Sequence, residues 1–291
     1  MLYHLVAMNP DQSCSSDQWS MVTSAASISQ LAGVLGGFLI TAIALLFDRN
    51  SREAVYTLAM FSSAVLILML DSYLFSIISG TVVPDDGDRQ GICAIAWSQG
   101  VLATGMLALG TTALFGGLGW MLASHAVSKA ADQHADELGS YCFLGALGGW
   151  LTFGSTMATT LIMSETAIDY LQFMYHRPPG LLTSTAVTGF AAVIILVDLW
   201  LVATRTRTLR RSLLDVDNPT LLNIRSIRFV TIAMAGLAVL ASWLTMSVNR
   251  FPESWLTTPK PAAVVVVVIL GFLAPSIIST GICHSVASTD D

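Results

Sequence analysis

Long apolar runs, separated by short polar connectors, fill almost the whole chain. Seven such runs can be traced, and each has about 20 or more residues, enough for a helix rising ~1.5 Å per residue to cross the ~30 Å hydrocarbon core of a bilayer. A soluble domain does not need stretches of that length. The pattern therefore predicts an all-α, polytopic integral membrane protein, a bundle of seven transmembrane helices. The predicted spans are residues 22–47, 54–82, 92–125, 139–164, 180–204, 227–248 and 262–284.

The connectors are polar and contain residues that end helices. Pro84 and Gly87 follow the second run, and Pro178 follows the fourth. Little chain is left outside the spans, so the sequence predicts one membrane domain (22–284) and no separate catalytic domain. The other predicted segments are an extracytoplasmic N-terminal tail (1–21), a cytoplasmic basic hairpin (205–226) and a cytoplasmic C-terminal tail (285–291).

The composition agrees with this class. Of the 291 residues, 54% are hydrophobic and 11% are charged, whereas soluble domains carry about 25% charged residues. The net charge of −6 says little about partners, because in a membrane protein the charge of each loop matters more than the sum. The 13 Lys and Arg residues form no long basic tail, so we expect no nucleic-acid partner.

The positions of Lys and Arg predict the orientation. If the N-terminus lies outside, nine of the 13 basic residues face the cytoplasm and four face outward. We therefore expect a multi-pass protein of the plasma (cytoplasmic) membrane with its N-terminus outside and its C-terminus inside. The nine are Arg49, Arg52, Lys129, Arg205, Arg207, Arg210, Arg211, Arg225 and Arg228.

The tryptophans agree with this orientation, because indole rings favour the membrane–water boundaries. In the predicted topology they form one belt on each side. The outer belt holds Trp19, Trp97, Trp243 and Trp255, and the inner belt holds Trp120, Trp150 and Trp200.

The four cysteines also divide between the two sides. Cys14 and Cys93 fall outside, where a disulfide persists, whereas Cys142 and Cys283 fall inside, where thiols stay reduced. A Cys14–Cys93 bridge would tie the N-terminal tail to the second outer segment. The alternative is that all four are unrelated small apolar residues, since spacing alone does not prove a bridge.

The fifth and sixth spans are predicted to extend into the cytoplasm as a basic hairpin. Its arginines would contact anionic lipid head groups on the cytoplasmic side. A docking site for a cytoplasmic partner is the alternative. The arginines are Arg205, Arg207, Arg210, Arg211, Arg225 and Arg228.

Stripes of small and hydroxyl residues predict how the helices pack. In a membrane such residues let helix backbones approach closely, and residues four apart share a helical face. The stripes serve packing, or else their hydroxyl groups line a polar path. The first span carries Ser29, Gly33, Gly37 and Thr41, and the third carries Gly100, Thr104, Thr112 and Gly116.

Two acidic residues fall within spans, where ionisable groups are costly and often functional. Asp71 has no basic residue deep in another span to pair with, so it is a candidate for permeation or proton coupling, together with Ser72 and Ser76 on a neighbouring face. Its alternative role is a neutral acid that hydrogen-bonds to an adjacent helix. Asp198 lies closer to the cytoplasmic end, two turns before Arg205, and we expect a boundary ion pair there, with permeation as the other role.

The last span combines a β-branched run at residues 264–269 with Pro275, which predicts a kink. His125 and His284 both fall near the inner face, but neither has a ligand motif around it. No nucleophile motif, phosphate loop or zinc signature is present. We therefore predict no catalytic residue, no metal site and no cofactor, and expect that the protein is not an enzyme.

Together these features favour a membrane transport protein, an oligomeric channel or conduit for a small ion, with a cation preferred over an anion. The expected partners are the lipid bilayer, the small ion and further copies of the chain. The alternative is a non-transporting assembly or signalling subunit that acts through the basic hairpin. A third hypothesis is an intramembrane enzyme that acts on lipid.

Overall fold

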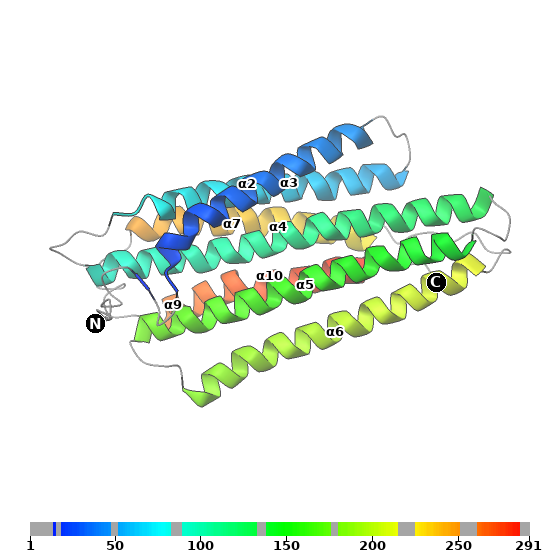
Figure 1. Ribbon diagram of the computed structural model, residues 1–291. Coiled ribbons are helices and arrows are strands. Elements are labelled where there is room, and N and C mark those ends of the chain that lie inside the picture. The colour runs from blue at the N-terminus through cyan, green and yellow to red at the C-terminus, as the bar shows by residue number, and fades with distance from the viewer. Residues whose placement is uncertain are drawn as a thin grey trace, which may run out of the picture.

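The computed structural model is all-helical and describes residues 14–15, 19–47, 52–82, 89–132, 138–175, 180–214, 225–250 and 261–285. Every apolar run of the sequence is helical, and the helices lie side by side along one direction (Figure 1). They are α2 (Met21–Leu46), α3 (Arg52–Ser79), α4 (Arg89–Asp132), α5 (Leu138–Tyr175), α6 (Leu181–Leu214) and α7 (Arg225–Ser247) with the 3-10 turn η2 (Val248–Arg250), then α9 (Pro261–Val268), the π-helical turn η3 (Ile269–Leu273) and α10 (Ala274–Ser285).

Among the described residues, six helical segments are long and apolar enough to cross a membrane. They make this a helical, multi-pass membrane protein. The segment that does not reach this level is α5, although it has 38 residues. Its many Gly, Ser and Thr residues lower its mean hydropathy, and the same residues give it polar contacts with its neighbours.

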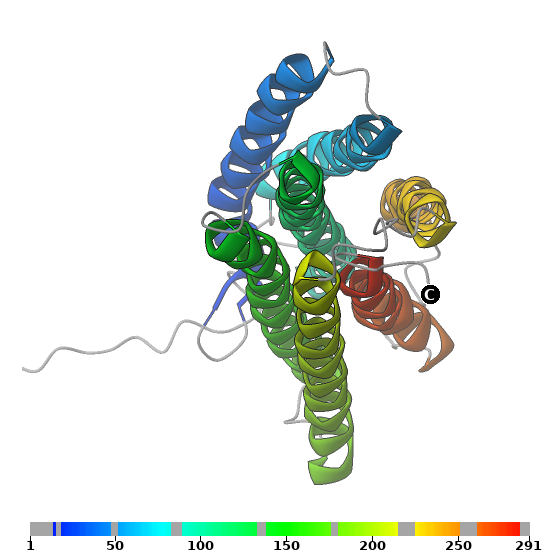
Figure 2. The same cartoon turned by 90° about the vertical axis from the view of Figure 1, so that its right-hand side faces the viewer.

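The helix α4 forms the centre of the bundle. In its apolar span 78% of the residues are buried, whereas in the other five apolar spans 17–44% of the residues are buried. Viewed along the bundle, α2 and α3 lie on one side of α4, and α5, α6 and α10 lie on the other (Figure 2). Most residues in the span of α4 therefore face another helix.

Two glycine pairs bring α4 close to its neighbours. A Cβ atom on Gly119 of α4 would lie 2.6 Å from the carbonyl oxygen of Gly148 on α5. A Cβ atom on Gly105 would lie 2.5 Å from the carbonyl oxygen of Gly271 in η3. Only residues without a side chain allow backbones to approach so closely, as is common between membrane helices.

The predicted stripe on α2 is only half correct as a packing face. Ser29 and Gly33 lie against Ser72 of α3, but Gly37 has no neighbouring atom within 4 Å, and Thr41 is exposed. Four residues advance a helix by about 40° more than one turn, so a stripe with constant four-residue spacing winds away from its partner. The buried face of α2 alternates steps of three, four and seven residues instead: Met21, Ala25, Ala32, Gly36, Leu39 and Leu46.

The stripe on α4 winds in the same way, but every position meets another helix because α4 is central. Gly100 lies against Met21 of α2, and Gly116 lies against Ile282 of α10. Thr104 is buried and donates to the carbonyl oxygen of Gly100 at 2.8 Å, while Thr112 faces α5. The stripe therefore serves several helix contacts rather than one.

Two of the predicted boundary tryptophans lie in the protein interior. Trp97 and Trp120 are on α4 and are fully buried, because a side chain on the central helix does not reach lipid. The indole of Trp97 donates to the carbonyl oxygen of Cys14 at 2.9 Å and stacks on Phe173. The exposed tryptophans are Trp150, Trp200 and Trp243, whereas Trp255 lies outside the described residues.

A disulfide between Cys14 and Cys93 links the segment before α2 to the start of α4, with the two Cα atoms 5.0 Å apart. Next to it, the edge of Trp19 contacts the ring of Trp97. The first turn of α2 is capped by Ser20, whose hydroxyl accepts from the backbone N–H of Thr23 at 3.3 Å. These contacts attach the first helix to the central one at this end of the bundle.

At the opposite end, α4, α5 and α6 extend beyond the other helices (Figure 1). With 44, 38 and 34 residues they are about 66, 57 and 51 Å long, far more than the ~30 Å of a hydrocarbon core. We call this end the projection: residues 122–132 of α4, 138–149 of α5 and 204–214 of α6. Leu209 of α6 packs there against Ala123 of α4, with Cys142 of α5 beside them.

Candidate functional site

Asp198 lies at the middle of α6 and is 1% exposed. Its carboxyl group faces Thr280 and Cys283 of α10. The hydroxyl of Thr280 donates to the carbonyl oxygen of Ser276 at 3.2 Å, and neither oxygen of Asp198 meets the hydrogen-bond geometry with any described residue. The carboxyl group thus lies inside the bundle with the Thr280 hydroxyl as a hydrogen-bonding neighbour.

Cys283 connects this carboxyl group to α5. Its sulfur lies 3.2 Å from the hydroxyl oxygen of Thr156, which donates in turn to the carbonyl oxygen of Thr152 at 2.9 Å. Further along, the hydroxyl groups of Thr159 on α5 and Thr112 on α4 lie 3.3 Å apart. Carboxyl, thiol and hydroxyl groups therefore follow one another between four helices.

We call this set the polar seam. Its members are polar residues of α4, α5, α6 and α10, and all are buried except the half-buried Thr280. They are Thr112, Thr152, Thr156, Thr159, Thr160, Asp198, Ser276, Ser279, Thr280 and Cys283.

Several polar atoms of the seam lack a hydrogen-bond partner among the described residues. Besides the two oxygens of Asp198, these are the hydroxyl oxygens of Thr160 and Ser279, and the same holds for Ser155 next to the seam. Most buried polar groups in proteins are hydrogen-bonded, because an unpaired one loses its solvation without compensation. The seam therefore has free hydrogen-bonding capacity that its own side chains do not use.

The seam ends toward the projection at a pair of basic side chains. A guanidinium nitrogen of Arg205 lies 3.0 Å from Nε2 of His284. A guanidinium group only donates, so Nε2 accepts and the imidazole is neutral with its proton on Nδ1. The expectation that Arg205 forms an ion pair with Asp198 is wrong, because Arg205 turns to α10 and Asp198 has no such partner among the described residues.

Asp71 of α3 has different surroundings. It is fully buried, and neither of its oxygens has a hydrogen-bond partner in the described part of the chain. Ser72 and Ser29 form a reciprocal pair: the Ser72 hydroxyl donates to the carbonyl oxygen of Ser29 at 2.9 Å, and the Ser29 hydroxyl donates to the carbonyl oxygen of Ser72 at 2.8 Å. Ser76 is exposed, so the three predicted residues do not share a polar surface. Successive helix residues point about 100° apart, which sends Asp71 and Ser72 toward different neighbours.

The two acids do not form one site. The helices that carry them, α3 and α6, lie on opposite sides of α4 (Figure 2). The seam surrounds Asp198 with thiol and hydroxyl groups, while the residues one turn away from Asp71 on α3 are apolar and buried: Ile67, Leu68, Leu74 and Phe75.

The two histidines also contact different residues. His125 of α4 packs its ring edge against Tyr141 of α5, whereas His284 binds Arg205. Among the described residues, no three His, Cys, Asp or Glu side chains gather in a way that could hold a metal ion.

The arginines of the predicted basic hairpin have different roles. Arg205 is half-buried through its contact with His284, while Arg207, Arg210 and Arg211 are exposed on the projection. Arg228 is exposed at the start of α7, and the side chain of Arg225 lies outside the described residues.

Sequence reasoning did not connect Cys283, Thr156 and Thr280 with Asp198. One signal was present: Ser276, Thr280 and Cys283 recur at three- and four-residue spacing in the last span. That spacing places polar groups on one face of an otherwise apolar helix. It does not say which helix the face meets.

No family model, curated protein or solved structure matches this chain.

Proposed function

We propose that the protein is a transport protein of the cytoplasmic membrane, a conduit for a small cation, and that this cation is the proton. The observation that carries the proposal is Asp198, a buried carboxyl group that faces the hydroxyl of Thr280 and the thiol of Cys283, which in turn contacts the hydroxyl of Thr156. Protons pass between such groups by small rotations, so a proton conduit needs no open pore. Acidic residues inside membrane helices are typical of proton relays.

The order of the polar groups in the seam supports a route for the proton. It starts at Arg205 and His284 next to the projection, continues through Asp198 and Cys283, and reaches Thr159 and Thr112 near the middle of their helices. Beyond that level, the hydroxyls of Ser98 on α4 and Tyr170 on α5 lie 3.3 Å apart. We propose that this pair continues the path to the other side.

The proposal places seven helices across the membrane. Although α5 is less apolar than the others, it lies along α4 over its length and is close to α6 toward the projection (Figure 1). A bilayer that contains α4 and α6 therefore contains α5, whose polar residues face the seam instead of lipid. The charge distribution supports an outer N-terminus, which places the projection and its exposed arginines in the cytoplasm.

The path lies within one bundle, so one copy of the chain is sufficient for it. We still propose a homo-oligomer, because α2 is only 17% buried within a single copy and leaves a long apolar face for another chain.

The experiment is proton flux into liposomes that contain the purified protein and a pH-sensitive dye. A potassium gradient with valinomycin drives the flux. Asp198→Asn removes the titratable proton but keeps the shape, and we expect about a hundredfold loss, a common effect of removing a proton-transfer group. Asp198→Glu should keep measurable flux. Equal flux in wild type and Asp198→Asn, or no flux in wild type, would contradict the proposal.

A second function, an assembly or signalling subunit without transport, is favoured by one observation. Arg207, Arg210 and Arg211 are exposed on the projection and have no part in the seam. Such a cluster suits anionic lipid head groups or an acidic protein surface. Capture of a cytoplasmic partner that is lost in the triple Arg→Gln variant, together with absence of flux in wild type, would favour this function over the first.

A further inference from the structure

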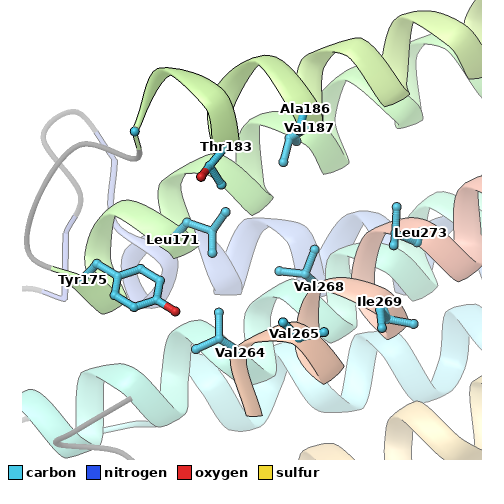
Figure 3. A pocket seen from close by; sticks show the side chains of 11 residues that line it. Leu171, Tyr175, Thr183, Ala186, Val187, Val264, Val265, Val268, Ile269 and Leu273 are labelled. Carbon is cyan, nitrogen blue, oxygen red and sulfur yellow. The ribbon is translucent and has the colours of Figure 1, made fainter. Parts of the chain in front are cut away.

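An apolar cavity of about 630 Å³ lies between the end of α5, the start of α6 and the last helix. Side chains of all three elements face the same space (Figure 3). Its volume is in the range of small-molecule sites, about 300–1,000 Å³. Neither Asp71 nor Asp198 lines it, so the cavity is separate from the polar seam.

The cavity is polar at one end only. The hydroxyl groups of Tyr175 and Thr183 lie at the end where α5 stops and α6 begins. From there the lining continues along Val264, Val268 and Leu273, which have no polar side-chain atom. A ligand that fits this lining has a short polar part and a long apolar part.

The length of the cavity matches one leaflet of a bilayer. Its lining covers Val264 to Leu273, about 13 Å of helix axis, and half of a ~30 Å hydrocarbon core is about 15 Å. The cavity begins where α6 enters the membrane, and the neighbouring Leu181 and Leu182 are 84% and 85% exposed. Its open side therefore faces the lipid phase.

A helix of a second copy is about 10 Å wide with its side chains, so it would also have to contact surfaces outside this cavity. A single acyl chain is narrower and can lie along the cavity lining alone. Water finds too few partners in an apolar cavity to occupy it stably.

We propose that this cavity binds an acyl chain of a bilayer phospholipid, with the glycerol ester region at Tyr175 and Thr183 and the chain end at Leu273. In the proposed orientation the lipid comes from the outer leaflet. The inference requires that α6 and α9 lie in a membrane, but it does not depend on the proton conduit.

The bound chain would also contact η3. Ile269 and Leu273 line the cavity, while Gly271 of the same turn faces α4, where a Cβ atom on it would lie 2.6 Å from Cγ1 of Val101. The acyl chain thus supports from the lipid side a π-helical turn that packs on the central helix from the other side.

The test uses the full-length protein in liposomes of phosphatidylcholine that carries a diazirine at the end of one acyl chain. After irradiation, mass spectrometry of peptides measures the labelling of each segment. We expect residues 268–273, where the chain end lies, to carry at least fivefold more label than the lipid-exposed residues Val193, Leu196 and Trp200 of α6. Equal labelling of these segments would overturn the proposal, and this wild-type comparison needs no variant.

Two matched variants sharpen the test. Ala186→Trp places a large ring in the cavity and should reduce labelling of residues 268–273 at least fivefold. Val193→Trp adds the same ring to α6 at a position that is 57% exposed and outside the lining, and should leave the labelling unchanged. Unchanged labelling in a folded Ala186→Trp protein would contradict the proposal. A cross-link between two copies through residues 264–273 would do so as well, since it identifies a protein as the occupant.

Discussion

The two buried acids of this protein differ in what surrounds them. Asp71 and Asp198 are both at most 1% exposed, and neither has a hydrogen-bond partner among the described residues. Asp198, however, has a thiol and hydroxyl groups from α5 and α10 within its surroundings, whereas the nearest turns of α3 around Asp71 are apolar. In the proposed function a proton passes on from Asp198 to these groups, whereas the residues one turn from Asp71 on its own helix carry no such group.

Burial of the carboxyl group is therefore common to both positions and does not distinguish them. Asp198 has a hydroxyl and a thiol group on the facing helix α10, whereas the residues one turn from Asp71 on its own helix are apolar. We therefore propose the proton path for Asp198 and the role of a neutral buried acid for Asp71. The following predictions test this distinction.

The largest difference is expected between two matched variants in the liposome assay. Asp198→Asn should reduce proton flux about a hundredfold, as removal of a proton-transfer group commonly does, while Asp71→Asn should change it less than about twofold. Both substitutions keep the side-chain shape and remove one titratable group. Equal losses in the two variants would show that the acids act together, and a larger loss for Asp71→Asn would reverse the assignment.

A second prediction tests the close packing of α4 against α5. Gly148→Ala places a Cβ atom 2.7 Å from Cα of Gly119, so α4 and α5 must move apart. We expect a loss of roughly 1–3 kcal/mol in the free energy of unfolding, the usual range for overpacking. Thermal unfolding in detergent measures it. Gly154→Ala on the same helix is the control, since no atom lies within 4 Å of its Cβ position; equal stability of both variants would contradict the close crossing.

A third prediction concerns the stability contributed by each acid. Asp71→Leu removes buried polar atoms without a partner and fills the same apolar space, so we expect unfolding to become about 1 kcal/mol more difficult. Asp198→Leu should give no such gain, because it leaves Cys283 and Thr280 facing an apolar group. The midpoint of thermal unfolding compares them. The opposite result, in which Asp198→Leu unfolds at a higher temperature than wild type and Asp71→Leu at a lower one, would contradict the prediction. It would mean that Asp71, and not Asp198, has the polar surroundings.

The smallest effect is expected from the thiol next to Asp198. Cys283→Ala removes the group between Asp198 and Thr156, and we expect a flux loss of about threefold, or ~0.7 kcal/mol, because neighbouring hydroxyls remain. Cys142→Ala changes the other free cysteine, which is half-buried in the projection, and should leave the flux unchanged. If Cys283→Ala has full flux, the path does not include the thiol.

The sequence predicted where the helices are better than it predicted which neighbour each side of a helix contacts. The bounds of the first and last spans were close to the prediction: the span expected at residues 22–47 is Met21–Leu46, and the span expected at 262–284 runs from Pro261 to Ser285. Three other helices are longer than predicted, since α4 ends at Asp132 instead of 125, α5 at Tyr175 instead of 164 and α6 at Leu214 instead of 204. The kink predicted from Pro275 stays a prediction; the structure has the π-helical turn η3 (Ile269–Leu273) shortly before this residue. The stripe of α2, the belt position of Trp97 and the ion pair of Asp198 were assigned to the wrong neighbours.

The reason lies in which interactions set each feature. A long apolar run becomes a helix because its backbone groups must pair within the segment in lipid, and this condition depends on local sequence alone. Which neighbour a residue faces depends on how helices distant in the sequence pack around α4, through contacts such as Gly119 with Gly148 and Arg205 with His284. Lipid-facing and buried surfaces are both apolar in a membrane protein, so hydropathy could reveal the helices but not their facing sides. Only the packed bundle brought Cys283 and Thr156 next to Asp198.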